Sequence, residues 1–510
     1  MILHYGKVRI SEDGAQDMTG QDNLPPPDDK TGQLSKRLIY FALTALFMCL
    51  GVLLIVLTRK IELVFGAVSF DQVLFHLSLP RDTIDPKVIE SMCRIGWAIK
   101  AFILCGGLFV CLSCLLIFRK LSLLISRFLC FFARRPALIG LLIASFVFVT
   151  GLGLFCAKLH ILQTFSSMIC KSQIIDENYC PAEHEDFQQR ETDGRILATN
   201  EKPNLVLIVS ESLESTFSDN TIFSEDLMPE LSRLRKQGDF TQDLFQVNGC
   251  HYTIASMYSI HYGMPLLYLT CTTGSPIQDN VLHKNCLSIF DILDDAGYNI
   301  CHLQGTSLSF AGQGALFAHL PQAKCIGVDD IPKTEYSSRQ NWGLWDSDLF
   351  DKAQQVVASL VEAEKPFALS IQTIDTHSGN VLQPGQESKY GDNRDLIRLQ
   401  SKLIGNFVAW LGKQPFATNT VIVILGDHNM MTKKIGNIEF SSPEKRRVFN
   451  CILNSRAGVK MGERSAAMFD YAPTILDALS FKWPSYSLGI GRSLYREKPT
   501  ILETYGKEKW

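Results

Sequence analysis

The chain has 510 residues, of which 46% are hydrophobic, and a length of this order normally means more than one folding unit. Its formal net charge is only −3, so it lacks the strongly basic field that attracts a nucleic-acid backbone. Long uncharged stretches are concentrated in the first third of the chain, which predicts a membrane region followed by a globular domain.

Three apolar runs in the first third are each long enough to cross a bilayer, which takes roughly 20 helical residues. The runs are Leu38 to Leu57, Ala101 to Phe118 and Ala137 to Ala157. None has the polar face typical of a core helix, so we predict three transmembrane helices within residues 37–157. Residues 1–36 start with a polar sequence and are predicted to be a disordered cytoplasmic tail, not a cleaved signal peptide.

The loop between the second and third runs indicates the orientation in the membrane. It holds five basic residues and no acidic residue, which favours the cytoplasmic side. These residues are Arg119, Lys120, Arg127, Arg134 and Arg135. Three spans then place a linker, residues 158–201, and a globular domain, residues 202–510, outside the cytoplasm. A weaker apolar segment, residues 63–79, is interrupted by an acidic residue and a histidine, so we expect it to lie on the outer face of the membrane.

Cysteine usage agrees with an exported domain, because disulfides form mainly outside the cytoplasm. Eight cysteines follow the last predicted span. Six of these cysteines lie close to another cysteine in the sequence, which suggests three disulfides and leaves two cysteines outside the pairs. The pairs are Cys170 with Cys180, Cys271 with Cys286, and Cys301 with Cys325, which leaves Cys250 and Cys451. The alternative, in which these cysteines are buried thiols, stays open.

From about Lys202 the sequence has the pattern of an α/β domain, with short apolar runs separated by helix-like stretches. Three of the runs are continuous and rich in Val and Ile, as in strands buried on both faces of a parallel sheet. They are Asn204 to Val209, Phe367 to Ile374 and Thr420 to Leu425. We therefore predict a mostly parallel central sheet covered by helices.

Acidic and imidazole side chains directly follow all three predicted strands. Glu211 follows the first, Asp375 and His377 the second, and Asp427 with His428 the third. The carboxyl ends of strands in an open α/β sheet form the crevice where ligands bind. A helix cap or turn explains any one of these residues, but three such endings favour a metal centre. Two carboxylates and an imidazole suit a divalent cation, manganese first, with magnesium or zinc as alternatives.

Several motifs, taken together and in order, resemble the alkaline-phosphatase superfamily. They are NLVLIVSESLESTF from Asn204, TIASM from Thr253, LQGTSLSFAGQG from Leu303, NWGLWD from Asn341, THSG from Thr376, LGDHNMM from Leu425 and FDYAPTILDA from Phe469. Within the superfamily they are similar to the phosphoglycerol transferases that decorate periplasmic glucans, and next to the lipoteichoic acid synthases. The resemblance runs from about Lys202 to Leu494. It implies an α/β alkaline-phosphatase-like domain behind the N-terminal α-helical transmembrane region.

The resemblance also implies the roles of individual residues. Thr253 corresponds to the catalytic threonine, which is itself a metal ligand with Glu211, Asp427 and His428, and His377 corresponds to a histidine that contacts the substrate phosphate. A metal-bound hydroxyl is activated as a nucleophile. The implied enzyme is anchored in the bacterial inner membrane and faces the periplasm. Its partners would be a phosphatidylglycerol-type donor, from which Thr253 takes the phosphoglycerol group, and a glycan or lipid-glycan acceptor.

Two departures from the family pattern bear on the substrate. Lipoteichoic acid synthases carry an aromatic and a basic residue near positions that hold Ala311 and Gln313 here, which argues against that activity. Gln313 and His251 are therefore candidate substrate contacts, with a surface turn as the alternative for His251. No Cys-x-Pro-Ser-Arg string of the arylsulfatases occurs. The alternatives are a phosphoethanolamine transferase acting on lipopolysaccharide, and a non-catalytic membrane-anchored binding protein.

Overall fold

The structure is a computed structural model. It describes residues 30–65, 70, 72–74, 136–159, 161, 174–175, 177–179, 188–189, 202–267, 287–340, 342–377, 380–432, 434–439, 445–507 and 510. These residues belong to two compact units, one with residues 30–52 and 136–150 and the other with the remaining residues.

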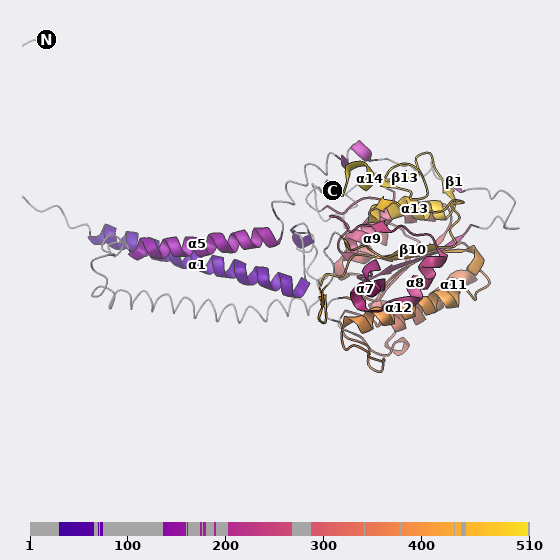
Figure 1. Ribbon diagram of the computed structural model, residues 1–510, viewed down its shortest axis with the longest axis horizontal. Coiled ribbons are helices and arrows are strands. Elements are labelled where there is room, and N and C mark those ends of the chain that lie inside the picture. The colour runs from indigo at the N-terminus through magenta and orange to yellow at the C-terminus, as the bar shows by residue number, and fades with distance from the viewer. Residues whose placement is uncertain are drawn as a thin grey trace, which may run out of the picture. The chain divides into compact units, whose positions relative to one another are not determined.

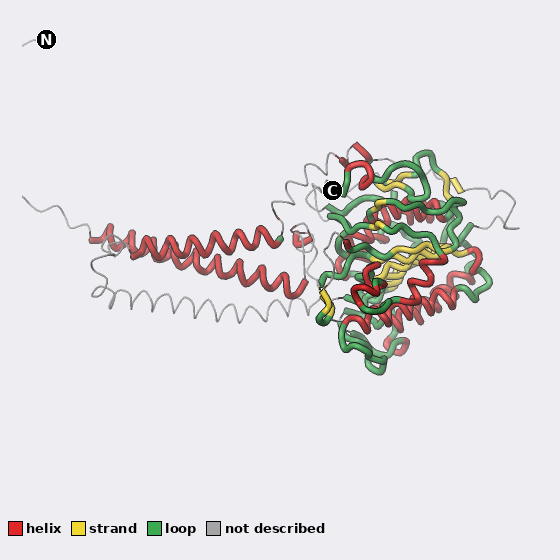
Figure 2. Tube along the Cα trace, in the orientation of Figure 1, coloured by secondary structure: helices red, strands yellow, loops and turns green. Residues whose placement is uncertain are grey.

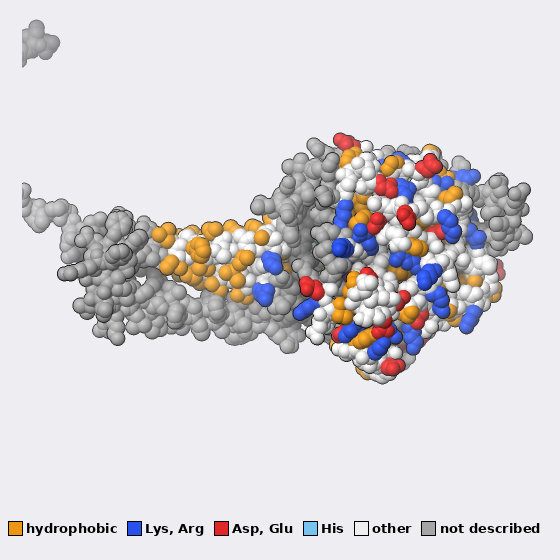
Figure 3. Space-filling model, in the orientation of Figure 1, with side chains coloured by type: hydrophobic (Ala, Val, Ile, Leu, Met, Phe, Trp, Pro, Cys, Tyr) orange, Lys and Arg blue, Asp and Glu red, His pale blue; other side chains and the backbone are white. Residues whose placement is uncertain are grey.

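Two long helices, α1 (Lys30–Phe65) and α5 (Pro136–Lys158), contain the first and third predicted spans. Each includes a stretch, Ala42–Arg59 or Gly140–Lys158, that could cross a membrane by its length and composition. Apolar side chains lie on their surface, as Figure 3 shows, and that of Phe146 is 72% exposed. Exposure of contiguous apolar surface is typical of a face that contacts lipid or protein.

The structure bears unequally on three predictions for the N-terminal part: the middle span, the surface segment and the disordered tail. The middle span, residues 101–118, lies outside the described residues, as does most of the segment 63–79. The predicted disordered tail is too long, because α1 begins at Lys30 and includes residues 30–36. No proline lies between Pro27 and the apolar run that starts at Leu38, so no proline opposes extension of the helix back to Lys30.

A six-stranded sheet forms the centre of the second unit, in the order β10-β7-β2-β6-β4-β5. Neighbouring strands are parallel, except that β10 pairs antiparallel with β7 at one edge. The strands are β2 (Asn204–Ser210), β4 (Asn299–Gln304), β5 (Lys324–Ile326), β6 (Phe367–Gln372), β7 (Thr420–Gly426) and β10 (Asn450–Leu453). The predicted mostly parallel sheet is confirmed, and the three strands predicted from the sequence are its neighbouring strands β7, β2 and β6.

Helices cover both faces of this sheet (Figures 1 and 2). The helices are α7 (Asn220–Phe223), α8 (Pro229–Gln237), α9 (Thr253–Tyr262), α10 (Ile289–Asp295), α11 (Asp346–Glu362), α12 (Asn393–Leu411), α13 (Tyr471–Ala478) and α14 (Ile501–Tyr505). Short 3₁₀ turns are η3 (Ser215–Ser218), η5 (Phe310–Phe317), η6 (Val328–Asp330), η7 (Lys333–Glu335), η8 (Ala417–Asn419) and η10 (Met468–Asp470). Minor strands are β1 (Gln188–Gln189), β3 (Asp243–Leu244), β8 (Lys434–Ile435), β9 (Ile438–Glu439), β11 (Ser465–Ala466), β12 (Phe481–Lys482), β13 (Ser487–Leu488) and β14 (Gly491–Arg492).

The side chains of β2 alternate between two hydrophobic cores. Leu207 and Val209 pack in a core with α9, α10 and α13, whereas Val206 and Ile208 pack in a second core with α8, α11 and α12. Successive residues of a strand point to opposite faces, so a continuously apolar strand needs helices on both. This explains why the sequence of β2 has no polar residue between its ends.

Strand β6 ends at Gln372, two residues before the end predicted from its apolar pattern. The backbone N–H groups of Ile374 and Asp375 donate to the carboxylate of Asp346, at 2.9 and 3.0 Å. A side chain from the start of α11 therefore replaces a neighbouring strand as the hydrogen-bond partner. The end of β6 depends on this distant residue and not on the local sequence.

The predicted disulfide between Cys301 and Cys325 is wrong, since both residues carry thiols. The two residues lie on the paired strands β4 and β5, but Cys325 is opposite His302. Cys301 packs in the core with α11 and α12, and Cys325 packs against the other core. Side chains one register position apart point to opposite faces of a sheet, which a disulfide cannot bridge. The other two predicted pairs lie outside the described residues.

His302 belongs to a buried polar chain on the α9 side of the sheet. The amide of Gln304 donates to the Ser307 carbonyl at 2.7 Å, which leaves its Oε1 to accept from His302 Nε2 at 2.8 Å. The Ser370 hydroxyl lies 3.2 Å from the other ring nitrogen, and the ring stacks on Phe317. This arrangement suits a neutral imidazole, and burial lowers the pKa of His302 to about 4.

We expect His302→Gln to reduce the loss of stability that this domain shows in acid. The folded-state pKa lies below the unfolded value of about 6.5, so the unfolded chain binds the extra proton and stability falls as pH drops below that value. Linkage with a folded pKa of about 4 gives about 2 kcal/mol lost by about pH 5. Chemical unfolding of the full chain in detergent at neutral and acid pH measures this, and an equal loss in both proteins would contradict it.

Candidate active site at the carboxyl edge of the sheet

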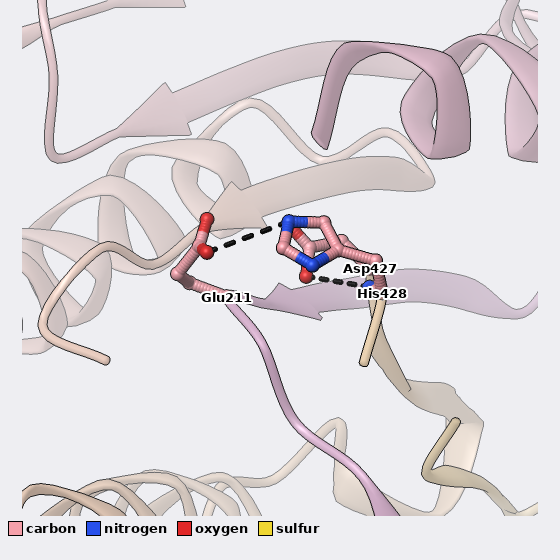
Figure 4. Close-up of side chains that lie close together, drawn as sticks. All are labelled: Glu211, Asp427 and His428. Atoms are coloured by element: carbon pink, nitrogen blue, oxygen red, sulfur yellow. Dashed lines mark hydrogen bonds and ion pairs between the residues drawn. The ribbon is translucent and has the colours of Figure 1, made fainter. Parts of the chain in front are cut away.

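Three buried side chains meet where β2 and β7 end at the same edge of the sheet. Glu211 follows β2, and Asp427 with His428 follows β7. Each residue is at most 1% exposed, and one ligand atom from each lies within 4.8 Å of the others (Figure 4). The turn after β7 ends the alternation of the strand, so the adjacent Asp427 and His428 can both face Glu211.

Two backbone N–H groups hold the carboxylate of Asp427. Its Oδ1 accepts from the N–H groups of Ser212 and His428, both at 2.7 Å. Its Oδ2 lies 3.5 Å from His428 Nε2 and has no hydrogen-bond partner among the described residues. At Gly426, a Cβ would lie 1.9 Å from the Leu213 carbonyl oxygen, so only glycine allows this approach of the two strand ends. One buried carboxylate oxygen is therefore left for a cation.

Glu211 is positioned by hydrogen bonds from both sides. Its N–H donates to Thr373 Oγ1 at 3.0 Å, and the Thr376 hydroxyl donates to its carbonyl. Its Oε1 accepts from the Ser212 hydroxyl at 2.7 Å. Ser212 has a φ of 52°, in the left-handed region that costs a non-glycine residue energy and that is typical of functional sites. The turn after β2 is therefore fixed in one strained conformation.

The orientation of the His428 ring follows from its other nitrogen. Nδ1 lies 2.9 Å from the carbonyl oxygen of Asn429, which can only accept, so Nδ1 carries a proton. Nε2 then faces the cluster, 3.5 Å from both Glu211 Oε1 and Asp427 Oδ2. In a neutral ring this nitrogen presents a lone pair, as a metal-ligating histidine does.

The charges of the cluster are unbalanced. Burial raises the pKa of Asp427 to about 7, and the Glu211 carboxylate acts in the same direction. Burial alone would lower the pKa of His428, but the carboxylates of Asp427 and Glu211 outweigh it and raise this pKa. Without a cation the cluster therefore retains protons. Its donor set, two carboxylates and an imidazole, fits a divalent ion.

Thr253 is the first residue of α9 and brings its hydroxyl to the same cluster. Its Oγ1 donates to Glu211 Oε2 at 3.2 Å and lies 3.4 Å from His428 Nε2. The hydroxyl thus faces these side chains, and Tyr252, not Thr253, is the N-cap residue of the helix. Ser256, one turn later, donates to the Asp427 carbonyl at 2.5 Å and fixes the helix start to the end of β7.

A buried ion pair joins the two loops that carry the cluster. Arg446 Nε donates to Glu214 Oε2 at 2.7 Å, and its Nη2 contacts both Glu214 Oε1 and the Met430 carbonyl. Glu214 is fully buried and Arg446 is 7% exposed. Glu214 lies three residues after Glu211, and Met430 lies two after His428. The pair therefore connects the two loops that carry the cluster through charged groups that water does not screen.

The other predicted site residues occupy separate positions. His377 follows Thr376, the residue that hydrogen-bonds to the Glu211 carbonyl. Gln313 lies in η5 and is 1% exposed, and its Oε1 has no hydrogen-bond partner in the described part of the chain. His251 precedes α9 and packs edge-to-face on Tyr252, with ring centroids 5.0 Å apart. The structure thus brings Thr253 to the three candidate ligands and places His377 beside the loop of one of them.

Two further acidic side chains lie behind the end of β6. Asp346 caps the turn after this strand, and the carboxylate of Asp375 accepts in return from the Asp346 N–H at 3.1 Å. Burial raises the pKa of Asp346 to about 7 and, with the charge of Asp346, that of Asp375 to about 9. From the sequence, Asp375 is recognisable only as a strand-end residue. Its partner Asp346 is the last residue of the NWGLWD motif and the first residue of α11.

Sequence reasoning also missed Ser212, Thr373 and the Glu214–Arg446 pair. Ser212 and Glu214 were within reach of it, because both lie in the SESLE run that carries Glu211. No local signal marks Arg446, whose partner is 232 residues away. Residues that support a site through long-range contacts carry no spacing that a single sequence reveals.

The fold and the site define an alkaline-phosphatase-like domain. The family model described as Sulfatase matches residues 203–480, more than half of the chain, and the chain belongs to this family. It is 28% identical over 306 residues to a phosphoglycerol transferase I of Salmonella arizonae and 29% identical over 304 residues to that of Shigella flexneri. These matches cover 58% and 57% of this chain but 39% of each relative, so the chain spans about two fifths of their length.

Solved structures also align with the chain, at lower identity. A protein of the alkaline phosphatase superfamily from Vibrio parahaemolyticus aligns with 18% identity and a TM-score of 0.46, over 58% of this chain and 70% of that one. The lipoteichoic acid synthase LtaP of Listeria monocytogenes aligns with 13% identity and a TM-score of 0.47, over 64% and 81%. Family membership and these relatives place the chain among enzymes of the phosphotransferase and sulfatase type.

We expect Arg446→Met to destabilise the domain by about 3 to 5 kcal/mol, because it leaves the carboxylate of Glu214 buried without its partner. The double variant Glu214→Leu with Arg446→Met should recover most of this loss. Lys389→Ala, which breaks an exposed pair with Glu225, is the control and should leave the stability almost unchanged. The measurement is the free energy of unfolding of each variant. An Arg446→Met protein as stable as wild type would contradict a stabilising role for the pair.

Proposed function

We propose that this protein is a membrane-anchored, metal-dependent phosphotransferase in which Thr253 is the covalent nucleophile. The observation that carries the proposal is the Thr253 hydroxyl 3.2 Å from Glu211, inside a buried cluster with Asp427 and His428. The transferred group is phosphoglycerol, taken from a phosphatidylglycerol-type lipid and given to a glycan or lipid-glycan acceptor. The name of the bacterial relatives, phosphoglycerol transferase I, supports this choice.

The ligands of the proposed cation are Glu211, Asp427, His428 and Thr253. The free Oδ2 of Asp427 and the lone pair of His428 Nε2 support this set. A bound divalent ion, with manganese as the first candidate, lowers the pKa of a hydroxyl and stabilises negative charge on phosphoryl oxygens. The metal-ligand loops are held by Ser212, so the side chains need no rearrangement when substrate binds.

The reaction has two displacements at phosphorus. In the first, Thr253 Oγ1 forms a bond to the phosphorus of the donor while the bond to diacylglycerol breaks, and the diacylglycerol oxygen leaves with a proton. Glu211 Oε2 already accepts the hydrogen bond of the Thr253 hydroxyl. In the second, an acceptor hydroxyl displaces Thr253 from the phosphoglycerol-threonine ester. The positive end of α9 attracts the phosphate, and His377 contacts one of its oxygens.

The N-terminal helices suit a lipid donor. A phospholipid does not leave the bilayer readily, so an enzyme that attacks its headgroup has to be held at the membrane surface. The apolar stretches of α1 and α5 are the proposed anchor. The basic loop, residues 119–135, supports the orientation that puts the catalytic domain outside the cytoplasm, in the periplasm of a bacterial inner membrane.

A phosphoethanolamine transferase would use the same threonine and the same cation, so the donor lipid distinguishes it. Sulfatase chemistry is disfavoured because the proposed nucleophile is Thr253. Arylsulfatases need a Cys or Ser that is converted to formylglycine within a Cys-x-Pro-Ser-Arg sequence, which does not occur here. Incubation of the full chain with manganese and either labelled phosphatidylglycerol or labelled phosphatidylethanolamine identifies the donor from the label retained on protein.

We expect Thr253→Ala to abolish transfer, with a fall of at least about 1,000-fold, because no other hydroxyl is assigned to the covalent step. The fold should remain intact, since the Thr253 side chain is half-buried and bonds only to the cluster. Release of diacylglycerol and label on the intact protein, followed by mass spectrometry of the peptide, are the measurements. Ser259→Ala on the same helix is the control, and undiminished turnover in Thr253→Ala refutes the mechanism.

We expect manganese to raise the melting temperature of the protein, because a ligand that binds only the folded state stabilises it. The rise should grow between about pH 6 and pH 8, because below about 7 a proton on Asp427 competes with the ion. Glu211→Gln and Asp427→Asn should remove the rise. Asp470→Asn, at a buried acid outside the cluster whose pKa is also about 7, should keep it. A manganese effect that survives in Asp427→Asn would place the ion elsewhere.

A further inference from the structure

Three rings pack together beyond the ends of the central strands. Trp342 contacts the ring of His377, with centroids 4.5 Å apart and an interplanar angle of 53°. Phe310 contacts the other part of Trp342 edge-to-face, with centroids 5.7 Å apart. All three residues are partly exposed. We call Phe310 and Trp342 the aromatic wall.

The loop that carries Trp342 is fixed before any substrate arrives. Gln340 donates to Asp375 Oδ1 at 2.8 Å, which links the loop to the end of β6. On the other side, the Leu344 N–H donates to the Gly305 carbonyl at 2.8 Å. At Gly343, a Cβ would lie 2.0 Å from that same carbonyl oxygen, so the residue next to Trp342 must be glycine. The indole is therefore held against His377 by contacts on both sides.

Phe310 is presented by a strained turn. Ala311 has a φ of 51° and Gly312 a φ of 74°, so two successive residues after Phe310 are left-handed. A non-glycine residue in this conformation is energetically unfavourable, and such strain clusters at functional sites. The chain thus keeps an unfavourable backbone where it presents an aromatic ring.

The wall stands next to the proposed metal-ligand loop. His377 directly follows Thr376, whose hydroxyl donates to the Glu211 carbonyl. In the proposed reaction the phosphate contacts both Thr253 and His377, so the headgroup that it carries can reach the rings that pack on His377. Neither ring of the wall is charged, and an aromatic face packs well against the CH groups of a neutral polyol.

We propose that Trp342, supported by Phe310, is the specificity residue that contacts the glycerol headgroup of the donor lipid. This inference rests on the proposed phosphoglycerol transfer. Trp342 contributes to substrate choice through the headgroup and not through the phosphate, which Thr253 and His377 engage.

Two donors separate headgroup contact from a general structural role. Phosphatidylglycerol and phosphatidylmethanol share the phosphate and the diacylglycerol leaving group and differ only in the headgroup. Diacylglycerol release by the full chain with manganese, in mixed micelles of each lipid, gives kcat/KM for both. The variants are Trp342→Ala and Trp342→Phe. Trp410→Ala, in α12 on the other face of the sheet where the ring stacks on Phe407, is the control.

We expect Trp342→Ala to lower the preference for phosphatidylglycerol over phosphatidylmethanol about tenfold, mainly through KM, the size of effect that a packing contact gives. Trp342→Phe should keep most of the preference, and Trp410→Ala all of it. An equal loss on both donors shows that Trp342 only supports the fold or His377, and it overturns the inference while leaving the proposed function standing. No diacylglycerol from either lipid in the wild type, or release only from phosphatidylethanolamine, overturns the phosphoglycerol assignment and the inference with it.

Discussion

Two carboxylates and one imidazole are buried together at the carboxyl edge of the sheet, and most of the surrounding structure serves to keep them there. Removing Asp427 and Glu211 from water is costly unless a cation or protons compensate the charge. The raised pKa of Asp427 and of His428 expresses this cost in the protein without an ion. A divalent cation satisfies the same charges with no proton, which makes the cluster a preformed metal site if the proposed function holds.

The fold meets this constraint by tying adjacent strand ends to one another. The parallel pair β2 and β7 brings Glu211 and Asp427 together in space, and the Ser212 N–H links one loop to the carboxylate of the other. The Arg446–Glu214 pair adds a second, charged connection between these loops. Thr253 comes from outside the sheet, and the hydrogen bond from Ser256 to the Asp427 carbonyl sets where α9 begins. The carboxylates of Glu211 and Asp427 are thus each held by a hydrogen bond from another segment of the cluster.

The substrate side of the site is built in the same way from distant segments. The acid pair of Asp346 and Asp375 ends β6 and, through Gln340, anchors the loop of Trp342. A single buried cluster of polar contacts therefore positions both His377 and the proposed headgroup contact. Trp342, from the loop before α11, packs against Phe310, which lies between β4 and β5. The segments of Phe310 and Trp342 are separate in the sequence. They meet in space because β6, β4 and β5 are neighbours in the sheet.

The sequence by itself determined the central strands, the mostly parallel sheet and the apolar stretches of α1 and α5. Continuous Val and Ile runs and uncharged stretches of about 20 residues are local patterns whose physical meaning does not depend on the rest of the chain. It also indicated Glu211, Asp427 and His428, because polar residues that directly follow buried strands share one edge. The tertiary structure decided where β6 ends, that Cys301 and Cys325 face opposite cores, and which groups support the cluster. These features depend on sheet register and on partners such as Glu214 and Arg446, 232 residues apart. Only folding brings such residues together, so no spacing along the chain could have revealed them.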